Sequence, residues 1–333
     1  MADQLFKIDN FVTQGGQVLD LVLAYQVHGQ LNTARDNLIL YPTYYAGRSE
    51  HNAYLIGEDM ALDPRKYCIV IPNLFGNGVS SSPSNTPQPW AASDFPSMSY
   101  YDNVACQCRL VREQFDTDRI HTVIGFSMGA MQAYQWVAQY PAMVERFIAI
   151  CGSARTSGHN KLFLDSIIAT LKADGTFNGG NYTSPPLRGL EAFSTVYAGW
   201  FASQKFYTKQ LYRGMGIDST AGVVEFAKSV FMQHDANDLI AMAETWRAGD
   251  PGANTLYGGD FAGAMGSIRA KGLVMPCDTD LYFRLSDNEE EVALLNDARL
   301  APIRSDFGHL AGGGMDGEAT RFIDSEIKML FDY

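Results

Sequence analysis

One segment constrains the fold of this chain more than any other: the strand-like run at 121–125 passes through Gly-Phe-Ser-Met-Gly directly into an apolar helical run. The pattern Gly-x-Ser-x-Gly at 125–129 is a weak signal alone, but here it ends a strand and begins a helix, as in a nucleophile elbow. Glycines flank Ser127 because so tight a turn leaves no room for a Cβ. Backbone N–H groups at the start of the helix stabilise negative charge beside the serine. The segment therefore predicts that Ser127 is a nucleophile rather than a serine in an ordinary strand-to-helix turn.

Short apolar runs bounded by turn residues recur on both sides of this segment. Such runs suit strands that are buried on both faces of a parallel sheet. Helical stretches at 101–116 and 128–140 separate some of them, and this alternation is typical of an α/β sheet with right-handed crossovers. Residues 6–27 alternate in polarity and predict a hairpin that turns at Gly15-Gly16. The apolar runs are 37–42, 67–75, 121–127, 147–152 and 272–278.

The alternation of strands and helices stops between residues 153 and 268. Three amphipathic segments lie there, around a loop rich in Gly, Asn and Pro at 174–187: they are 161–173, 188–212 and 221–247. Open α/β sheets bind ligands beyond the carboxyl ends of their strands, so a helical insertion of this size is most simply a lid over that end. We divide the chain into a first core part at 1–155, a helical lid at 156–268 and a second core part at 269–333.

A serine hydroxyl is a poor nucleophile until a base takes its proton. Downstream of a nucleophile elbow, the acid and the histidine follow in the order Ser, Asp, His. His309, near the C-terminus in Ser-Asp-Phe-Gly-His-Leu, comes directly after a strand-like Ala-Pro-Ile at 301–303 and is the predicted base. Three other histidines are rejected, the first two because they lie in or beside the lid region and the third because it precedes the serine: His159, His234 and His51.

The acid is expected just after the strand that follows the lid. The segment Gly-Leu-Val-Met-Pro-Cys-Asp-Thr-Asp offers two aspartates, Asp278 and Asp280. Asp280 is preferred because it is better placed in the loop beyond the strand, where it can orient the imidazole and stabilise its cation. Asp278 remains the alternative, with capping of the turn as its other role.

Acyl transfer to a serine also needs two hydrogen-bond donors for the oxyanion. The backbone N–H of Met128, the residue after the nucleophile, is one. The second is expected from the loop after the first central strand, at 42–47, where the N–H of Tyr44 is preferred over that of Thr43. The Tyr44-Tyr45 pair could equally serve as aromatic packing, so the prediction concerns the backbone of Tyr44.

Composition limits the partners. Lys and Arg total 25 against 37 Asp and Glu, a net charge of −12, which disfavours nucleic acid and anionic membranes. No apolar run approaches the roughly 18 residues of a membrane span. The five cysteines are scattered, as in a reduced compartment, and Cys106-x-Cys108 has no second pair for a metal site. Residues 76–81 lack the third glycine of a dinucleotide-binding loop, and the phosphate-binding motif Gly-x-x-x-x-Gly-Lys-Ser/Thr does not occur in the sequence. We expect a soluble cytoplasmic protein without cofactor or metal.

With the elbow in place, longer segments of the chain resemble the homoserine O-acyltransferase family of the α/β-hydrolase superfamily. The similarity covers roughly 20–160 and 270–312. It implies the α/β-hydrolase fold, with a mostly parallel central sheet and a helical lid inserted before the strand that carries the catalytic acid. It also implies a Ser127–Asp280–His309 triad and a homodimer formed through the lid. The matching segments include LAYQVHGQLNTARDNLILYP, ALDPRKYCIVIPNLFGNGVSSSPS, FPSMSYYDNVACQCRLV, HTVIGFSMGAMQAYQWVAQYPAMVERFIAICGSARTSGHN, DTDLYF and SDFGH.

The departures from that family point away from an amino-acid acceptor. The family's Asn-Val-Leu-Gly-Gly-like loop is Asn-Leu-Phe-Gly-Asn-Gly here. Family transferases hold the homoserine carboxylate with a lid arginine, where this chain has Trp200, and follow the histidine with an acid, where it has Leu310. Trp200 and Leu310 are the predicted substrate-pocket residues. The resemblance therefore favours a serine esterase that hydrolyses small, chiefly acetyl, esters through an acyl-enzyme. The alternative is an acyltransferase that uses acyl-CoA.

Overall fold

The computed structural model describes residues 2–332 and is built on an eight-stranded sheet in the order β1-β2-β4-β3-β5-β6-β7-β8. β2 pairs antiparallel with β1 and β4, and every other neighbouring pair is parallel. This is the predicted mostly parallel α/β sheet. Its strands are β1 (Gln4–Val12), β2 (Val18–His28), β3 (Leu38–Leu40), β4 (Cys68–Pro72), β5 (Ile120–Phe126), β6 (Val144–Ile150), β7 (Lys271–Met275) and β8 (Ala298–Leu300).

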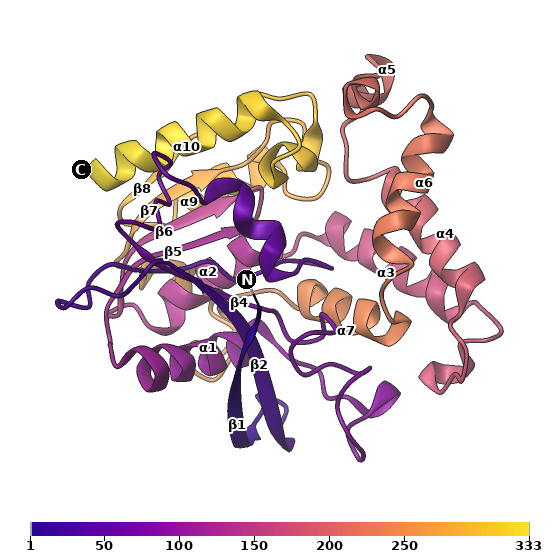
Figure 1. The fold of residues 1–333 in the computed structure, drawn as a ribbon, viewed down its shortest axis with the longest axis horizontal. Coiled ribbons are helices and arrows are strands. Elements are labelled where there is room, and N and C mark those ends of the chain that lie inside the picture. The colour runs from indigo at the N-terminus through magenta and orange to yellow at the C-terminus, as the bar shows by residue number, and fades with distance from the viewer. Residues whose placement is uncertain (1, 333) are drawn as a thin grey trace.

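Helices cover both faces of the sheet (Figure 1). On one face, α1 (Tyr100–Phe115) and α2 (Met128–Gln139) share a core with β3, β5 and β6. On the other face, α10 (Gly317–Asp332) packs on the same strands through Ile323 and Ile327. The central strands are buried on both sides, which explains why their sequences are continuous apolar runs rather than alternating ones.

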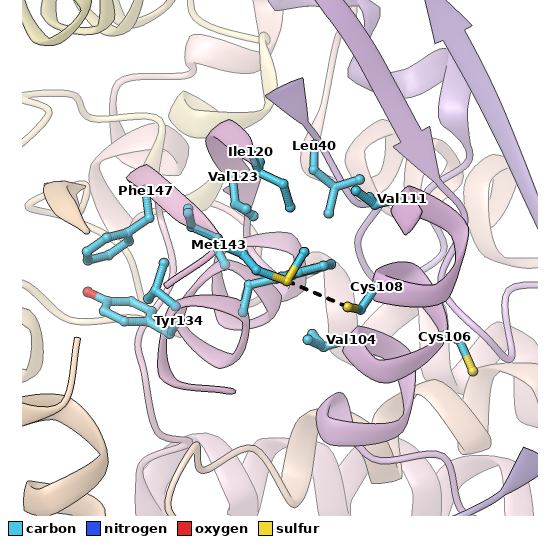
Figure 2. Close-up of a cluster of buried hydrophobic side chains, with 14 of the residues drawn as sticks. Leu40, Val104, Cys106, Cys108, Val111, Ile120, Val123, Tyr134, Met143 and Phe147 are labelled. Carbon is cyan, nitrogen blue, oxygen red and sulfur yellow. Dashed lines mark hydrogen bonds between the residues drawn. The ribbon is translucent and has the colours of Figure 1, made fainter. Parts of the chain in front are cut away.

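Figure 2 shows the core between α1 and the sheet. Cys108 points toward Met143, with its sulfur 3.8 Å from the thioether, while Cys106 points away from that contact. All five cysteines are buried free thiols. Among residues 2–332, no group of three or more His, Cys, Asp or Glu side chains is arranged to hold a metal ion.

Between β6 and β7 the described chain contains helices and no strand, as the sequence pattern predicts. In Figure 1 most of these helices gather beside the sheet, at one side of the molecule. We call residues 151–270 the helical insert; its function as a lid and as a dimer contact stays a prediction. Its helices are α3 (Gly158–Lys172), α4 (Leu187–Ala198), α5 (Gln204–Thr208), α6 (Thr220–Phe231), α7 (Ala236–Arg247) and α8 (Phe261–Gly266).

The bounds of several predicted elements differ in the structure. The predicted segment 188–212 is divided into α4, α5 and a short 3-10 helix at Leu211–Met215. The predicted segment 221–247 is two helices, because Asp235 caps a new helix with its carboxylate on the N–H groups of Asn237 and Asp238. The strand before His309 is Ala298–Leu300 rather than 301–303; Ile303 forms an isolated bridge with Cys277. In the part of the chain that the structure describes, no helix has both the length and the apolar character needed to cross a bilayer.

Candidate active site

Ser127 lies in the tight turn between β5 and α2. Its backbone has φ 56° and ψ −124°, in the left-handed half of the map that non-glycine residues rarely occupy. A Cβ on Gly125 would lie 2.0 Å from the carbonyl carbon of Gly129, and one on Gly129 would lie 2.6 Å from the carbonyl oxygen of Pro42. Both flanking glycines are therefore required by close backbone approach, and the strained turn presents the serine hydroxyl at the carboxyl end of β5.

The structure brings Ser127, His309 and Asp280 together in one hydrogen-bonded chain. His309 Nε2 lies 2.9 Å from Ser127 Oγ, and His309 Nδ1 lies 2.7 Å from Asp280 Oδ2. An ionised carboxylate can only accept, so Nδ1 carries the proton in the neutral imidazole and Nε2 is left to accept from the serine hydroxyl. All three side chains are buried, with 3%, 8% and 5% of Ser127, His309 and Asp280 exposed.

Aromatic rings enclose the imidazole of His309. Its centroid lies 4.7 Å from the ring of Phe126, 4.9 Å from that of Tyr282 and 5.6 Å from that of Phe283. These contacts limit the imidazole to the orientation in which each nitrogen meets its partner.

The two candidate aspartates have different partners. Asp280 faces His309 with one carboxylate oxygen, while the other accepts hydrogen bonds from the N–H groups of Tyr282 at 2.8 Å and Phe283 at 3.3 Å. Asp278 instead pairs with Arg304 at 3.2 Å and accepts from the Ser305 N–H at 3.2 Å. Asp280 is thus the aspartate next to the imidazole, and Asp278 holds the neighbouring loop.

The backbone N–H groups beside Ser127 include two without a partner. Thr43 uses its own N–H on the Pro72 carbonyl at 3.1 Å, so it has no N–H left for a ligand. Within residues 2–332 the N–H groups of Tyr44 and Met128 have no hydrogen-bond partner. The contact of Gly129 with Pro42 holds the first turn of α2 against the loop that carries Tyr44. Of the two candidates, Tyr44 is therefore the one whose N–H is free within the described residues, and its role as the second donor stays a prediction.

A cavity of about 300 Å³ opens onto Ser127 and His309. Tyr44, Ala46 and Phe126 line it from the core, and the helical insert supplies a large apolar share of its wall. Among residues 2–332, no Asp, Glu, Lys or Arg side chain lines it. The insert residues on the wall are Tyr197, Phe201, Phe226, Ala227, Val230 and Phe231.

Comparisons with known proteins agree with this geometry. Residues 42–176 match the model of the alpha/beta hydrolase fold family. The ethyl acetate hydrolase of Pseudomonas veronii is 38% identical over 98% of this chain and 95% of its own length. The chain belongs to the α/β-hydrolase family. The solved structure of the acetyl esterase MekB has a TM-score of 0.97 at 36% identity, over 100% of this chain and 97% of that one.

The chain is also similar in sequence to homoserine O-acetyltransferases. The homoserine O-acetyltransferase of Trichormus variabilis is 29% identical over 90% of this chain and 86% of its own. The resemblance predicted from the motifs is thereby confirmed. Of the two relatives compared by sequence, the ethyl acetate hydrolase is the more similar to this hydrolase.

Of the two predicted pocket residues of this hydrolase, the structure brings one to the cavity. Leu310 lies on the wall, but Trp200 does not. α4 ends at Ala198; Tyr197 in its last turn and Phe201 just after its end both line the cavity. The ring of Trp200 instead packs 4.8 Å from that of Phe163 and 5.0 Å from that of His159. The assignment of Trp200 to the pocket is corrected accordingly.

The other histidines of this hydrolase take different places. His51 lines the cavity, although its position before Ser127 removes it from the expected order of triad residues. Its Nδ1 accepts from the Arg48 N–H at 3.1 Å. Burial, followed by the charges of Arg48 and His51, lowers the pKa of His234 to about 4. No local motif identified His51 or the α6 residues as parts of the cavity wall, because their position near the serine depends on tertiary packing.

Proposed function

We propose that this protein is a serine carboxylic-ester hydrolase that cleaves short-chain, chiefly acetyl, esters of apolar alcohols through a covalent acyl-enzyme on Ser127. The single observation that carries the proposal is the chain of contacts from Ser127 Oγ through His309 to Asp280, at 2.9 and 2.7 Å. It gives a buried hydroxyl both a base and an oriented acid at the mouth of a cavity. The ethyl acetate hydrolase and the acetyl esterase among the relatives support the same reaction class.

In the first half-reaction, Ser127 Oγ attacks the ester carbonyl carbon while His309 Nε2 takes the hydroxyl proton. The carbonyl oxygen becomes an oxyanion, which the N–H groups of Tyr44 and Met128 stabilise. Asp280 keeps the proton on Nδ1 and stabilises the imidazolium. The C–O bond to the alcohol then breaks, His309 returns the proton to the departing alkoxide, and the acyl group remains on Ser127.

In the second half-reaction, a water molecule takes the place of the alcohol. His309 removes one of its protons as the water oxygen attacks the acyl carbon. The bond to Ser127 Oγ then breaks, and His309 returns the proton to the serine. The carboxylic acid is released and the enzyme is restored, so one ester and one water yield one acid and one alcohol.

The apolar wall favours water over an amino-acid acceptor. Homoserine would bring an ammonium and a carboxylate into the cavity, where desolvating a charge is costly unless the protein supplies a partner. Leu310 follows the histidine, and none of the cavity-lining side chains among residues 2–332 is a carboxylate or a guanidinium. Each charge-assisted hydrogen bond contributes about 1.5–3 kcal/mol. Without two such anchors, productive binding of homoserine should be weaker by roughly 10²- to 10⁴-fold.

The test compares both reactions in one preparation. Hydrolysis of p-nitrophenyl acetate and ethyl acetate is followed with and without millimolar homoserine, and O-acetylhomoserine formation from acetyl-CoA is followed in parallel. We expect ester hydrolysis that homoserine does not change and that is lost in Ser127→Ala. Transfer from acetyl-CoA faster than ester hydrolysis would establish the acyltransferase alternative instead.

A further inference from the structure

The loops that carry the acid and the base lie side by side, and one hydroxyl joins them. Thr279, the residue before Asp280, donates from Oγ1 to the Ser305 carbonyl at 2.6 Å. The same oxygen accepts from the N–H of Gly308, the residue before His309, at 3.2 Å. Resting on the proposed function, we infer that Thr279 is a positioning residue, which sets the distance between the acid and the base through these two hydrogen bonds.

The backbone at Gly308, directly before His309, is closely packed and has little room to move. Gly308 has φ +66°, and a Cβ there would lie 2.5 Å from the backbone nitrogen of Ser203 in the helical insert. The next residues are tied to the same insert segment, because Leu310 donates its N–H to the Phe201 carbonyl at 3.3 Å. The Gly308 peptide is thus in close contact with the insert on one side. On the side of the acid, its N–H donates a hydrogen bond to the Thr279 hydroxyl.

Other ties hold a different part of this loop. Asp278 contacts Arg304 and the Ser305 N–H, and the Ser305 hydroxyl donates to Asp316 at 2.6 Å. These contacts secure residues 304 and 305, which are five and four positions before the histidine. Loss of the Thr279 hydroxyl would leave them intact and release the Gly308 N–H, while the Ser305 carbonyl would keep only its longer contact with Cys277 Sγ at 3.5 Å.

The distances within the triad make such a release costly. His309 has to meet Ser127 at 2.9 Å and Asp280 at 2.7 Å at once, and the acid and the base come from the two loops that Thr279 joins. A displacement of about 1 Å in such a constellation can cost about 10²-fold in rate. Because Thr279 is absent from the cavity wall, its loss should reduce turnover while substrate binding is retained.

The test uses Thr279→Val, which keeps the shape and removes the hydroxyl, and Thr279→Ser, which restores it. Thr170→Val is the matched control, since Thr170 is also half-buried and donates to a carbonyl at 2.7 Å, but within α3. We expect Thr279→Val to lower kcat about 10- to 100-fold with KM within about twofold. Labelling of Ser127 by a small fluorophosphonate should slow by a similar factor. The kcat of Thr279→Ser should lie within about threefold of that of the unmodified protein. The kcat of Thr170→Val should equal that of the unmodified protein.

Melting temperature and circular dichroism separate positioning from stability. The inference is overturned if folded Thr279→Val keeps its kcat, if KM changes instead of kcat, or if Thr279→Ser loses as much as Thr279→Val. Should Thr279→Val not fold, Thr279→Ala is compared with Thr279→Ser by the same criteria. Ser127→Ala tests the proposed function separately: activity retained there refutes the nucleophile, whereas a dead Ser127→Ala beside a fully active Thr279→Val refutes the role of Thr279 alone.

Discussion

Replacing Asp280 by asparagine should leave the fold intact and nearly abolish turnover. One oxygen of the Asp280 carboxylate accepts from the N–H groups of Tyr282 and Phe283, so these donors hold the amide oxygen of the new side chain on that side. The amide NH₂ then faces His309 Nδ1, which lies 2.7 Å from the position of Oδ2. A donor at that place requires Nδ1 to accept, which moves the imidazole proton to Nε2. The nitrogen that should take the proton from Ser127 is then already protonated.

The size of the loss follows from the tautomer. When the imidazole is held in the wrong tautomer by the same substitution in a serine protease triad, kcat falls by about 10⁴-fold. That factor corresponds to about 5.5 kcal/mol of transition-state stabilisation. Here two backbone donors hold the orienting oxygen of the buried side chain, so we expect a loss of the same order, about 10⁴-fold. Asp278→Asn should cost less than about tenfold, since Asp278 contacts Arg304 and Ser305 rather than the imidazole.

The assay is kcat/KM for p-nitrophenyl acetate at about pH 7.5 for the three proteins, with melting temperatures measured alongside. Asp278→Asn serves as the matched control because it makes the same chemical change two residues away. Activity of Asp280→Asn within about tenfold of the unmodified protein would refute the tautomer argument. A larger loss in Asp278→Asn than in Asp280→Asn would show that the other aspartate carries the role.

Three further predictions concern the nucleophile, the cavity and stability. Ser127→Ala and His309→Ala should each lower kcat at least about 10⁴-fold, because the two act as a unit; a variant that keeps a tenth of the activity removes that residue from the mechanism. Ala227→Leu places a larger side chain on the cavity wall and should lower kcat/KM for hexyl acetate about tenfold more than for ethyl acetate, whereas an unchanged ratio would place α6 outside the substrate path. Burial raises the pKa of Asp238 to about 7, so the folded state retains its proton more tightly than the unfolded state and stability falls as pH rises from about 4 to about 7. Asp238→Asn keeps partners for Ser84 and should flatten that fall, measured as melting temperature at about pH 4.5 and about pH 8; an equal fall in both proteins would contradict the assignment.

Local patterns were sufficient where the environment of a residue is set by its own neighbours. The glycines at 125 and 129 are needed by the turn itself, so Ser127 is visible in the sequence. The continuous apolar runs of β4 and β5 record burial on both faces. The preference for Asp280 over Asp278 rested on position in the loop, and the structure supplies its physical basis in the contact with His309. The strand before the histidine was misplaced because Ile303 is as apolar as a strand residue, although it forms a single bridge.

The amino-acid sequence by itself determined the class of fold, the order of the proposed triad residues and the position of the serine turn, because these depend on periodicity and on steric demands within a few residues. Tertiary structure alone decided which side chains surround the reactive hydroxyl. Ser127 and His309 are 182 positions apart, and the α6 residues that line the same cavity come from a third segment of the chain. Trp200 and Phe201 are adjacent aromatic residues, yet the turn after α4 directs one to Phe163 and the other to the cavity. Hydrophobicity records that a residue is buried, but the partner it is buried against depends on how distant segments pack.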